Sequence, residues 1–171
     1  MLKYVYKRVK NMPTTTIDDT SLAILACLQR DGRAPYQAIA DQVGLSRPAV
    51  MERVKRLEEQ GIITGYAAVV DRQKIGRPIT AFINVRYPSS THVGTEPWIA
   101  QLLHHPDVLE CHHVAGDDCF ILKVSVSAVE RLQDVLRALR PRGEPANTRT
   151  TIVLSTIFEK SGLAPEVPAD G

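Results

Sequence analysis

The chain has 171 residues, a length that suits one large domain or two small ones. Its hydrophobic fraction of 44% is ordinary for a globular protein, and no run approaches the roughly 18 apolar residues that a membrane helix needs, so a membrane protein is excluded. The net charge of +2 conceals an asymmetry that favours nucleic-acid binding by the first half, because residues 1–75 carry 12 Lys and Arg against 8 Asp and Glu (+4) and the remainder carries 9 against 11 (−2).

Residues 1–16 are a basic N-terminal extension that contains Lys3, Lys7, Arg8 and Lys10. They lack the apolar stretch and the small-residue cleavage site of a secretory signal. The three cysteines of the chain are irregularly spaced, which fits a reducing cytoplasm better than a disulfide framework. We therefore expect a cytoplasmic protein in which this extension is a dispensable arm.

Two short helices are predicted at the start of a domain that covers residues 17–64. The first spans residues 18–30, and Asp18 is its expected N-cap because a side-chain oxygen there accepts a hydrogen bond from a free N–H one turn on. The second spans residues 35–43, with a proline suited to its first turn. Gly44 then ends it.

The stretch GLSRPAVMERVKRLEEQG, residues 44–61, predicts a third helix with both ends marked. Ser46 is its N-cap, Pro48 falls in its first turn, and Gly61 stands where a left-handed residue ends a helix. Its apolar stripe is narrow and its polar face is wide. A helix, a short glycine turn and a capped basic helix are typical of a helix-turn-helix, whose second helix enters the major groove of DNA. The alternative is a solvated surface helix.

The side chains expected to contact DNA lie on and beside this third helix. Its N-terminal half enters the groove most deeply, so base edges are expected to meet Arg47, Pro48, Met51, Glu52 and Lys55. Ser46 opens the helix, and the residues placed for phosphates are Arg33, Arg53 and Arg56. Arg53 flanks the apolar stripe, and a structural salt bridge is therefore its alternative role.

A boundary between two domains is expected within residues 65–79. Residues 62–71 are rich in β-branched side chains, which favours an extended segment that serves as a hinge strand. Residues 71–78, DRQKIGRP, are polar and contain Gly and Pro, as linkers do. Near the other end of the chain, residues 161–171 lack periodicity and are expected to be a disordered tail.

Residues 80–160 alternate strand and helix patterns in the order βαββαβ. Strands are expected at residues 79–87, 108–114, 119–126 and 148–158, and helices at 96–105 and after a capping box at 127–130. The apolar sides of the two helices are assigned to Trp98, Ile99, Leu102 and Leu103, and to Val129, Leu132, Val135, Leu136 and Leu139.

This order predicts an α+β chain whose second domain is a ferredoxin-like βαββαβ unit. The helices of such a unit cover one face of its sheet. The other face needs a cover, most simply a second copy of the chain, so we expect a homodimer.

The chain resembles the Lrp/AsnC family, the feast/famine transcription regulators, over residues 17–160. The resemblance is carried by ILACLQRDGR, DQVGLSRPAVMERVKRLEEQGIITGY, HHVAGDDCFILKV and TTIVLSTI, in that order and spacing. It implies an N-terminal winged helix-turn-helix, a hinge strand, and a βαββαβ domain that assembles dimers, often into octamers. It also implies that free amino acids bind between dimers, and no further cofactor.

The same resemblance implies an effector site at the loop that joins the second and third strands of this domain. The family's loop often reads G-D-Y-D-Y, and Cys119 here replaces a carboxylate that in many members can hold an ammonium group. An apolar or sulfur-containing amino acid is therefore expected to fit best. The alternative is a plain hairpin turn. The expected effector-binding residues are Gly116, Asp117, Asp118 and Cys119, with Thr150 and Ser155 supplied by a neighbouring subunit.

Metal binding and catalysis find little support in the sequence. Six Cys and His residues of the second half are candidate metal ligands, but they lack the regular pairs of a zinc site: His104, His105, Cys111, His112, His113 and Cys119. No nucleophile motif or Gly-rich phosphate loop is present. Siroheme decarboxylases are similar to this family in fold and use histidines near a tetrapyrrole, so His112 or His113 in that role is the alternative to a regulator.

Overall fold

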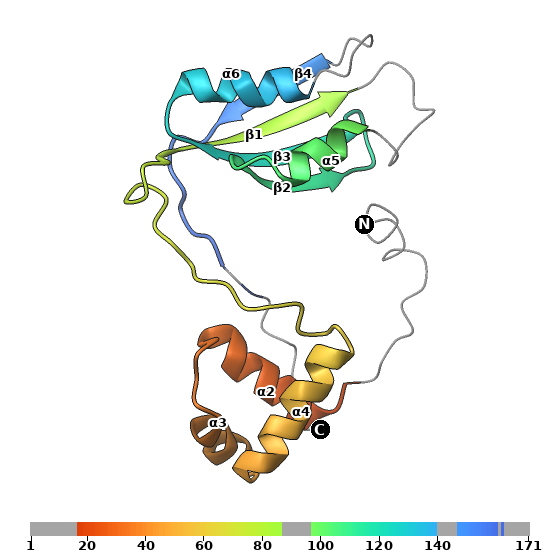
Figure 1. Cartoon of the computed structure of the whole chain (residues 1–171), viewed down its shortest axis with the longest axis vertical. Helices are drawn as coiled ribbons and strands as arrows, with labels where there is room; N and C mark the ends of the chain where they lie inside the picture. The colour runs from red at the N-terminus through yellow and green to blue at the C-terminus, as the bar shows by residue number, and fades with distance from the viewer. Residues whose placement is uncertain (1–16, 87–96, 140–146, 161, 163–171) are drawn as a thin grey trace. The chain divides into compact units, whose positions relative to one another are not determined.

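The computed structural model describes residues 17–86, 97–139, 147–160 and 162, and the chain divides into two compact units (Figure 1). One unit continues to Val69 and resumes at Phe158; the other spans Val70–Ile157. The predicted arm at residues 1–16 and nearly all of the predicted tail lie outside the described residues. Among the described residues, no helix is long and apolar enough to span a membrane.

The first unit contains the three expected helices, α2 (Asp19–Arg30), α3 (Tyr36–Val43) and α4 (Arg47–Glu59). Asp18 is the N-cap of α2, where its Oδ1 accepts from the Ser21 N–H at 2.7 Å. Ser46 is the N-cap of α4, with the Ala49 N–H 3.4 Å from its Oγ. Both predictions are confirmed. Pro35 differs, because its extended ψ of 136° makes it the N-cap of α3 rather than a first-turn residue.

Glycine ends the second and third helices, as the sequence predicts. Gly44 and Gly61 both have a φ of +69°, a left-handed conformation that side chains with a Cβ rarely adopt. After α4, the Gly61 N–H donates to Glu58 O and the Ile62 N–H donates to Leu57 O, the two bonds of a Schellman motif. The helices share a small core built from Ile24, Cys27, Ile39, Ala40, Val50 and Val54.

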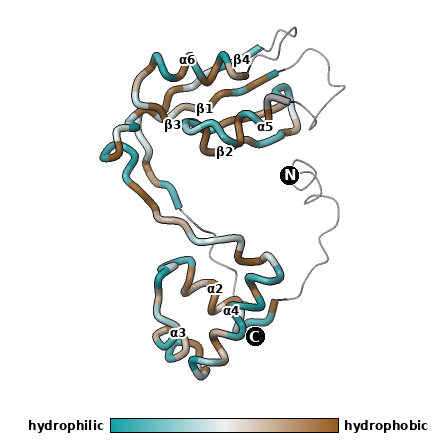
Figure 2. The backbone as a smooth tube through the Cα atoms, viewed as in Figure 1, coloured by the Kyte–Doolittle hydropathy of each residue, from teal (hydrophilic) through white to brown (hydrophobic). Residues whose placement is uncertain are grey.

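The expected hinge strand is wrong: residues 64–70 form no strand. A strand needs a neighbour to satisfy its backbone groups, and the described part of the chain provides none for this segment. Its apolar side chains are exposed as well, with Val69 81% and Val70 53% accessible. Figure 2 colours part of this segment as hydrophobic. Residues 71–77, predicted as a plain linker, instead form hydrogen-bonded turns.

The second unit confirms the βαββαβ order. Its elements are β1 (Ile79–Arg86), α5 (Pro97–Leu103), β2 (Val108–His113), β3 (Phe120–Val126), α6 (Val129–Ala138) and β4 (Asn147–Ile152). The sheet order is β2-β3-β1-β4, with every neighbouring pair antiparallel. This is the ferredoxin-like arrangement, with two helices packed on one face (Figure 1).

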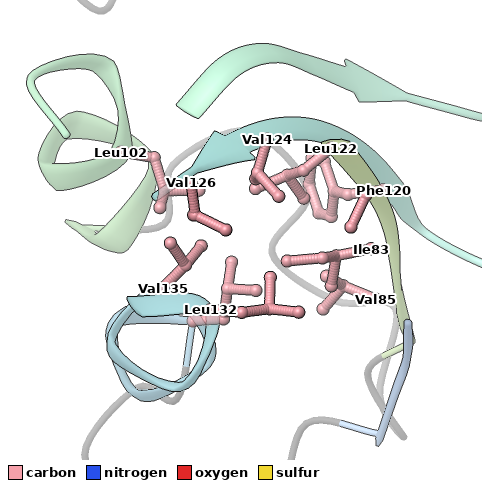
Figure 3. Close-up of a cluster of buried hydrophobic side chains, with 11 residues drawn as sticks. Ile83, Val85, Leu102, Phe120, Leu122, Val124, Val126, Leu132 and Val135 are labelled. Carbon is pink, nitrogen blue, oxygen red and sulfur yellow. The ribbon is translucent and has the colours of Figure 1, made fainter. Parts of the chain in front are cut away.

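The central strands alternate between a buried and an open face. Ala81, Ile83 and Val85 of β1 are fully buried, whereas Phe82 between them is 39% exposed. Side chains from β1 and β3 meet Leu102 of α5 and Leu132 and Val135 of α6 in the main core (Figure 3). Partners opposite one another in a sheet share a face. The helix-free face therefore holds Glu110, His112, Ile121, Lys123, Phe82, Asn84, Arg149 and Thr151.

The last strand is shorter than expected. β4 ends at Ile152, opposite Ala81, because β1 begins at Ile79 and leaves almost no partner beyond that point. One further bond, from the Val153 N–H to Thr80 O at 2.9 Å, closes the ladder. The residues that follow are exposed, with Leu154 99% accessible.

Three side-chain predictions in this unit are wrong. The capping box fails because Ala128 is the N-cap of α6 and no side chain caps the helix, which places Ser127 outside it. Val129 is 50% exposed in the first turn of α6, and Leu103 is 63% exposed at the last residue of α5. Both lie at helix ends, beyond the reach of the sheet, whereas Leu102, Leu132, Val135 and Leu139 are buried as predicted.

Candidate DNA-binding surface and effector loop

The polar face of α4 is open, as the helix-turn-helix prediction requires. Its buried stripe is Val50, Val54 and Leu57, which packs the helix on its own unit. All of the side chains predicted for base edges are exposed: Arg47, Pro48, Met51, Glu52 and Lys55. The same face therefore combines the cation of Arg47, near the helix N-terminus, with Met51, whose side chain is 46% exposed.

The cations on and near α4 differ in whether they have an ion-pair partner. Arg56 pairs with Glu52 at 3.5 Å and Lys55 with Glu59 at 3.8 Å, both exposed pairs one turn apart. Such pairs are weak and exchange readily with other partners. Among the described residues, Arg47 and Arg33 have no ion-pair partner, so their guanidinium groups are free to meet phosphates or bases.

Arg53 is already engaged inside the unit. Its Nη1 lies 2.6 Å from Asp18 Oδ2 and 3.1 Å from Ser21 Oγ, and both partners belong to the start of α2. The Arg53 guanidinium, together with the bonds from Ser21, lowers the pKa of Asp18 from 3.8 to about 2. The structural salt bridge, rather than a phosphate contact, is the role that these distances support.

The predicted effector loop joins β2 to β3 as a hairpin. The Val114 N–H donates to Cys119 O at 3.0 Å and closes it. Gly116 has a φ of +142°, a region that favours glycine, and a Cβ added there meets no atom within 4 Å. The backbone of the loop is therefore open to a ligand at this point.

The loop residues have distinct surroundings. Cys119 packs against the main core, and its N–H donates to Val85 O at 2.8 Å. Asp118 Oδ2 accepts from Asn84 Nδ2 at 2.5 Å and lies 3.4 Å from Arg149 Nη2. Asp117 is exposed, and the described residues offer it no partner. Asp117 is thus the loop carboxylate that remains available.

Within one chain, Thr150 and Ser155 do not join this loop. Thr150 lies opposite the buried Ile83, on the side of the sheet that the helices cover. Ser155 lies beyond the end of β4 and is exposed. The contacts of Asp118 come instead from Asn84 and Arg149, on the helix-free face. Sequence reasoning missed both, although Asn84 stands between the apolar Ile83 and Val85.

The histidines and cysteines of the second unit are dispersed. His112 Nε2 lies 3.1 Å from Glu110 Oε2 on the helix-free face, whereas the His113 ring stacks beside Phe120 at a centroid distance of 5.2 Å on the other face. Burial raises the pKa of the Cys111 thiol. Among the residues that the structure describes, no group of three His, Cys, Asp or Glu side chains is placed to hold a metal ion.

Comparison with known proteins matches each unit to a family. Residues 17–64 match the winged helix-turn-helix DNA-binding family, and residues 80–163 match the Lrp/AsnC ligand-binding domain. A similar curated protein is the uncharacterized HTH-type transcriptional regulator YezC of Bacillus subtilis. It is 38% identical over 140 residues, which cover 82% of this chain and 95% of that protein.

Two similar solved structures contain L-methionine. One is a feast or famine regulatory protein of M. tuberculosis, 32% identical with a TM-score of 0.77, covering 86% of this chain and 99% of the other. The second is a transcriptional regulator of Neisseria meningitidis, 27% identical with a TM-score of 0.77, covering 86% and 96%.

Proposed function

The chain belongs to the Lrp/AsnC family of DNA-binding transcription regulators, which have a ligand-binding domain and are not enzymes, and from this premise we propose that it is an amino-acid-responsive regulator. A free amino acid binds at residues 116–119, and its binding alters the assembly of the protein on DNA. The observation that carries this proposal is the open loop at Gly116 beside the unpaired carboxylate of Asp117.

The DNA contact is proposed to run through the exposed face of α4. Arg47 stands at the helix N-terminus, where a guanidinium can bond guanine in bidentate fashion. Arg56 and Arg33 supply phosphate contacts, which position the protein without reading sequence. The exposed Met51 adds an apolar contact of the kind that the thymine methyl group receives.

The effector's charged groups fit the chemistry of the loop. Successive backbone N–H groups at a left-handed glycine form a concavity that accepts a carboxylate, and Gly116 allows close approach. Asp117 receives the ammonium group, because Asp118 is already bonded to Asn84 and Arg149. The two relatives solved with L-methionine support an apolar, sulfur-containing side chain.

Assembly is proposed to begin with a dimer through the helix-free face. Phe82 is exposed there on a central strand, and the partly buried Ile121 lies diagonally across from it on β3. Dimers then associate further, up to an octamer, with the effector loop near the contact between them. An effector that binds one assembly more tightly shifts the population toward it and changes which DNA-binding units reach adjacent sites.

Calorimetric titration of the full chain with each of the twenty amino acids tests the effector assignment. We expect heat from methionine or another apolar amino acid and none from lysine or arginine. Asp117→Asn should weaken that binding at least 10-fold. Absence of heat from all twenty amino acids would show that the protein has no amino-acid site, and unchanged affinity in Asp117→Asn would show that the ligand site is elsewhere.

A further inference from the structure

Asp107, in the turn between α5 and β2, is a carboxylate buried among charged partners. Its side chain is 4% exposed. Arg77 bonds Asp107 Oδ1 through Nη1, and Arg131 Nη2 lies 2.9 Å from Asp107 Oδ2. The two guanidiniums come from different places: Arg77 lies two residues before the start of β1, and Arg131 lies on α6. Burying a carboxylate is costly unless it is paired with cations and hydrogen-bonded, and the two guanidiniums provide both.

Arg77 makes further contacts that hold its backbone in place. Its Nη1 donates to Pro106 O at 3.0 Å and to Ser125 O at 3.2 Å. The hydroxyl of the buried Ser125 donates back to Arg77 O at 3.1 Å. Both the side chain and the carbonyl of Arg77 are therefore bonded to the second unit.

The segment before Arg77 is folded onto it. Asp71 Oδ1 accepts from the Gln73 and Lys74 N–H groups at 3.0 and 3.3 Å, as an N-cap does. At the other end, Gly76 has a φ of +75°, and its N–H donates to Gln73 O. The Arg77 N–H donates to Arg72 O at 2.8 Å, which completes a Schellman motif. Residues 71–77 thus form one capped turn that ends at the bonded Arg77.

On the other side of the boundary, Tyr66 is tied to α4. Its hydroxyl donates to Glu58 Oε1 at 3.0 Å. Tyr66 is half exposed, and its partial desolvation, with the Glu58 hydrogen bond, raises the pKa of Tyr66 to about 12. Within the described chain, residues 67–70 make no hydrogen bond. The boundary between the two units falls between Val69 and Val70 in the sequence.

We propose that Asp107 is a positioning residue: through Arg77 it fixes residues 71–77 to the rest of the second unit, and so it confines the hinge of the first of the two chain crossings between the units to residues 67–70. The hinge is then four residues long rather than the whole predicted linker of residues 65–79. A short hinge contains few freely rotating backbone bonds. A rearrangement of the second unit is therefore passed on to the DNA-binding unit with less loss than through a long flexible linker. The inference rests on these contacts alone and holds whether or not residues 116–119 bind an amino acid.

The cluster provides a matched pair of variants. Arg77→Ala removes the contact to the linker and leaves Asp107 paired with Arg131. Arg131→Ala removes the other guanidinium from the same carboxylate and leaves the linker contact intact. Each variant costs Asp107 one partner, so a loss of general stability affects both, whereas release of residues 71–77 affects only the first.

Hydrogen exchange of the full chain, read by mass spectrometry, tests the proposal. In the wild type, a peptide over residues 71–77 should be protected. Arg77→Ala should speed its exchange at least 10-fold, whereas Arg131→Ala should stay within 3-fold of the wild type. A peptide over β3 reports the core in the same samples. Equal exchange of residues 71–77 in both variants, or no protection in the wild type, would overturn the proposal.

If Arg77→Ala proves too unstable to fold, Arg77→Lys decides the question, because it keeps the charge on a shorter side chain that does not reach the position from which Arg77 Nη1 bonds Pro106 O, Asp107 Oδ1 and Ser125 O. Faster exchange of residues 71–77 with an unchanged β3 peptide supports the positioning role. An equal increase in both peptides contradicts it, since Arg77 would then support the whole domain rather than the turn.

Discussion

Arg53 and Asp18 join the recognition helix to the start of the first helix. The guanidinium of Arg53 lies 2.6 Å from one oxygen of Asp18, while the other oxygen caps α2 through the Ser21 N–H. The carboxylate of Asp18 therefore caps the N-terminus of α2 and also holds Arg53 of α4. Arg53 therefore stabilises the packing of α4 against α2, and the exposed Arg47 is the arginine that we propose contacts DNA.

Replacing Arg53 with Ala should lower the free energy of unfolding by about 0.5–1.5 kcal/mol, in the range of a part-exposed ion pair with additional hydrogen bonds. Urea denaturation of the full chain measures it. Arg47→Ala is the matched control and should change stability by less than about 0.5 kcal/mol, as surface substitutions usually do. Equal effects of the two variants would contradict the assignment.

The same ion pair predicts a pH dependence. The folded pKa of Asp18 is lowered from 3.8 to about 2, so its contribution is fully present above pH 3.8 and is lost as the pH falls toward 2. The stability gap between wild type and Arg53→Ala should therefore narrow over that interval. Because the Asp18 side chain is 57% exposed, the pH-dependent part of the gap should be about 1 kcal/mol or less. A gap that stays constant down to pH 2 would show that Asp18 is not its source.

Specific DNA binding should depend steeply on salt, because phosphate contacts release counterions. Arg47→Ala should cost about 1–3 kcal/mol on a specific site if Arg47 contacts a base. Arg33→Ala is the comparison, and it should weaken binding to specific and random duplexes alike, because Arg33 is assigned to phosphate. Fluorescence anisotropy over a salt series measures both. Equal losses for Arg47→Ala on the two duplexes would make Arg47 a phosphate contact.

The sequence predicted best where local chemistry decides the structure. Asp18, Ser46 and Gly61 mark helix ends through their own backbone and side-chain bonds, and each lies where predicted. The order of the second unit was also predictable, because apolar periodicity reflects burial against one shared core.

What the sequence did not predict depends on distant partners. The end of β4 is set by where β1 begins, about 70 residues earlier in the chain. Asn84 reaches Asp118 only because β1 is the neighbour of β3, and Arg77 meets Asp107 only after the sheet and helices have assembled. One local prediction also failed: the capping box is absent, because Ala128 and not Ser127 takes the N-cap position of α6.

Dimerisation through the helix-free face predicts that two surface substitutions change the oligomeric state differently. Phe82→Glu places a charge on a central strand where a second copy is expected, and burying an unpaired charge is costly. The variant should be monomeric at micromolar concentrations at which the wild type is at least a dimer. Val129→Glu is the matched control, because Val129 is also exposed but lies on α6, which covers the other face. Light scattering on the full chains compares them. If Phe82→Glu keeps the wild-type mass while Val129→Glu lowers it, the subunits associate through the helices instead of through the open face of the sheet.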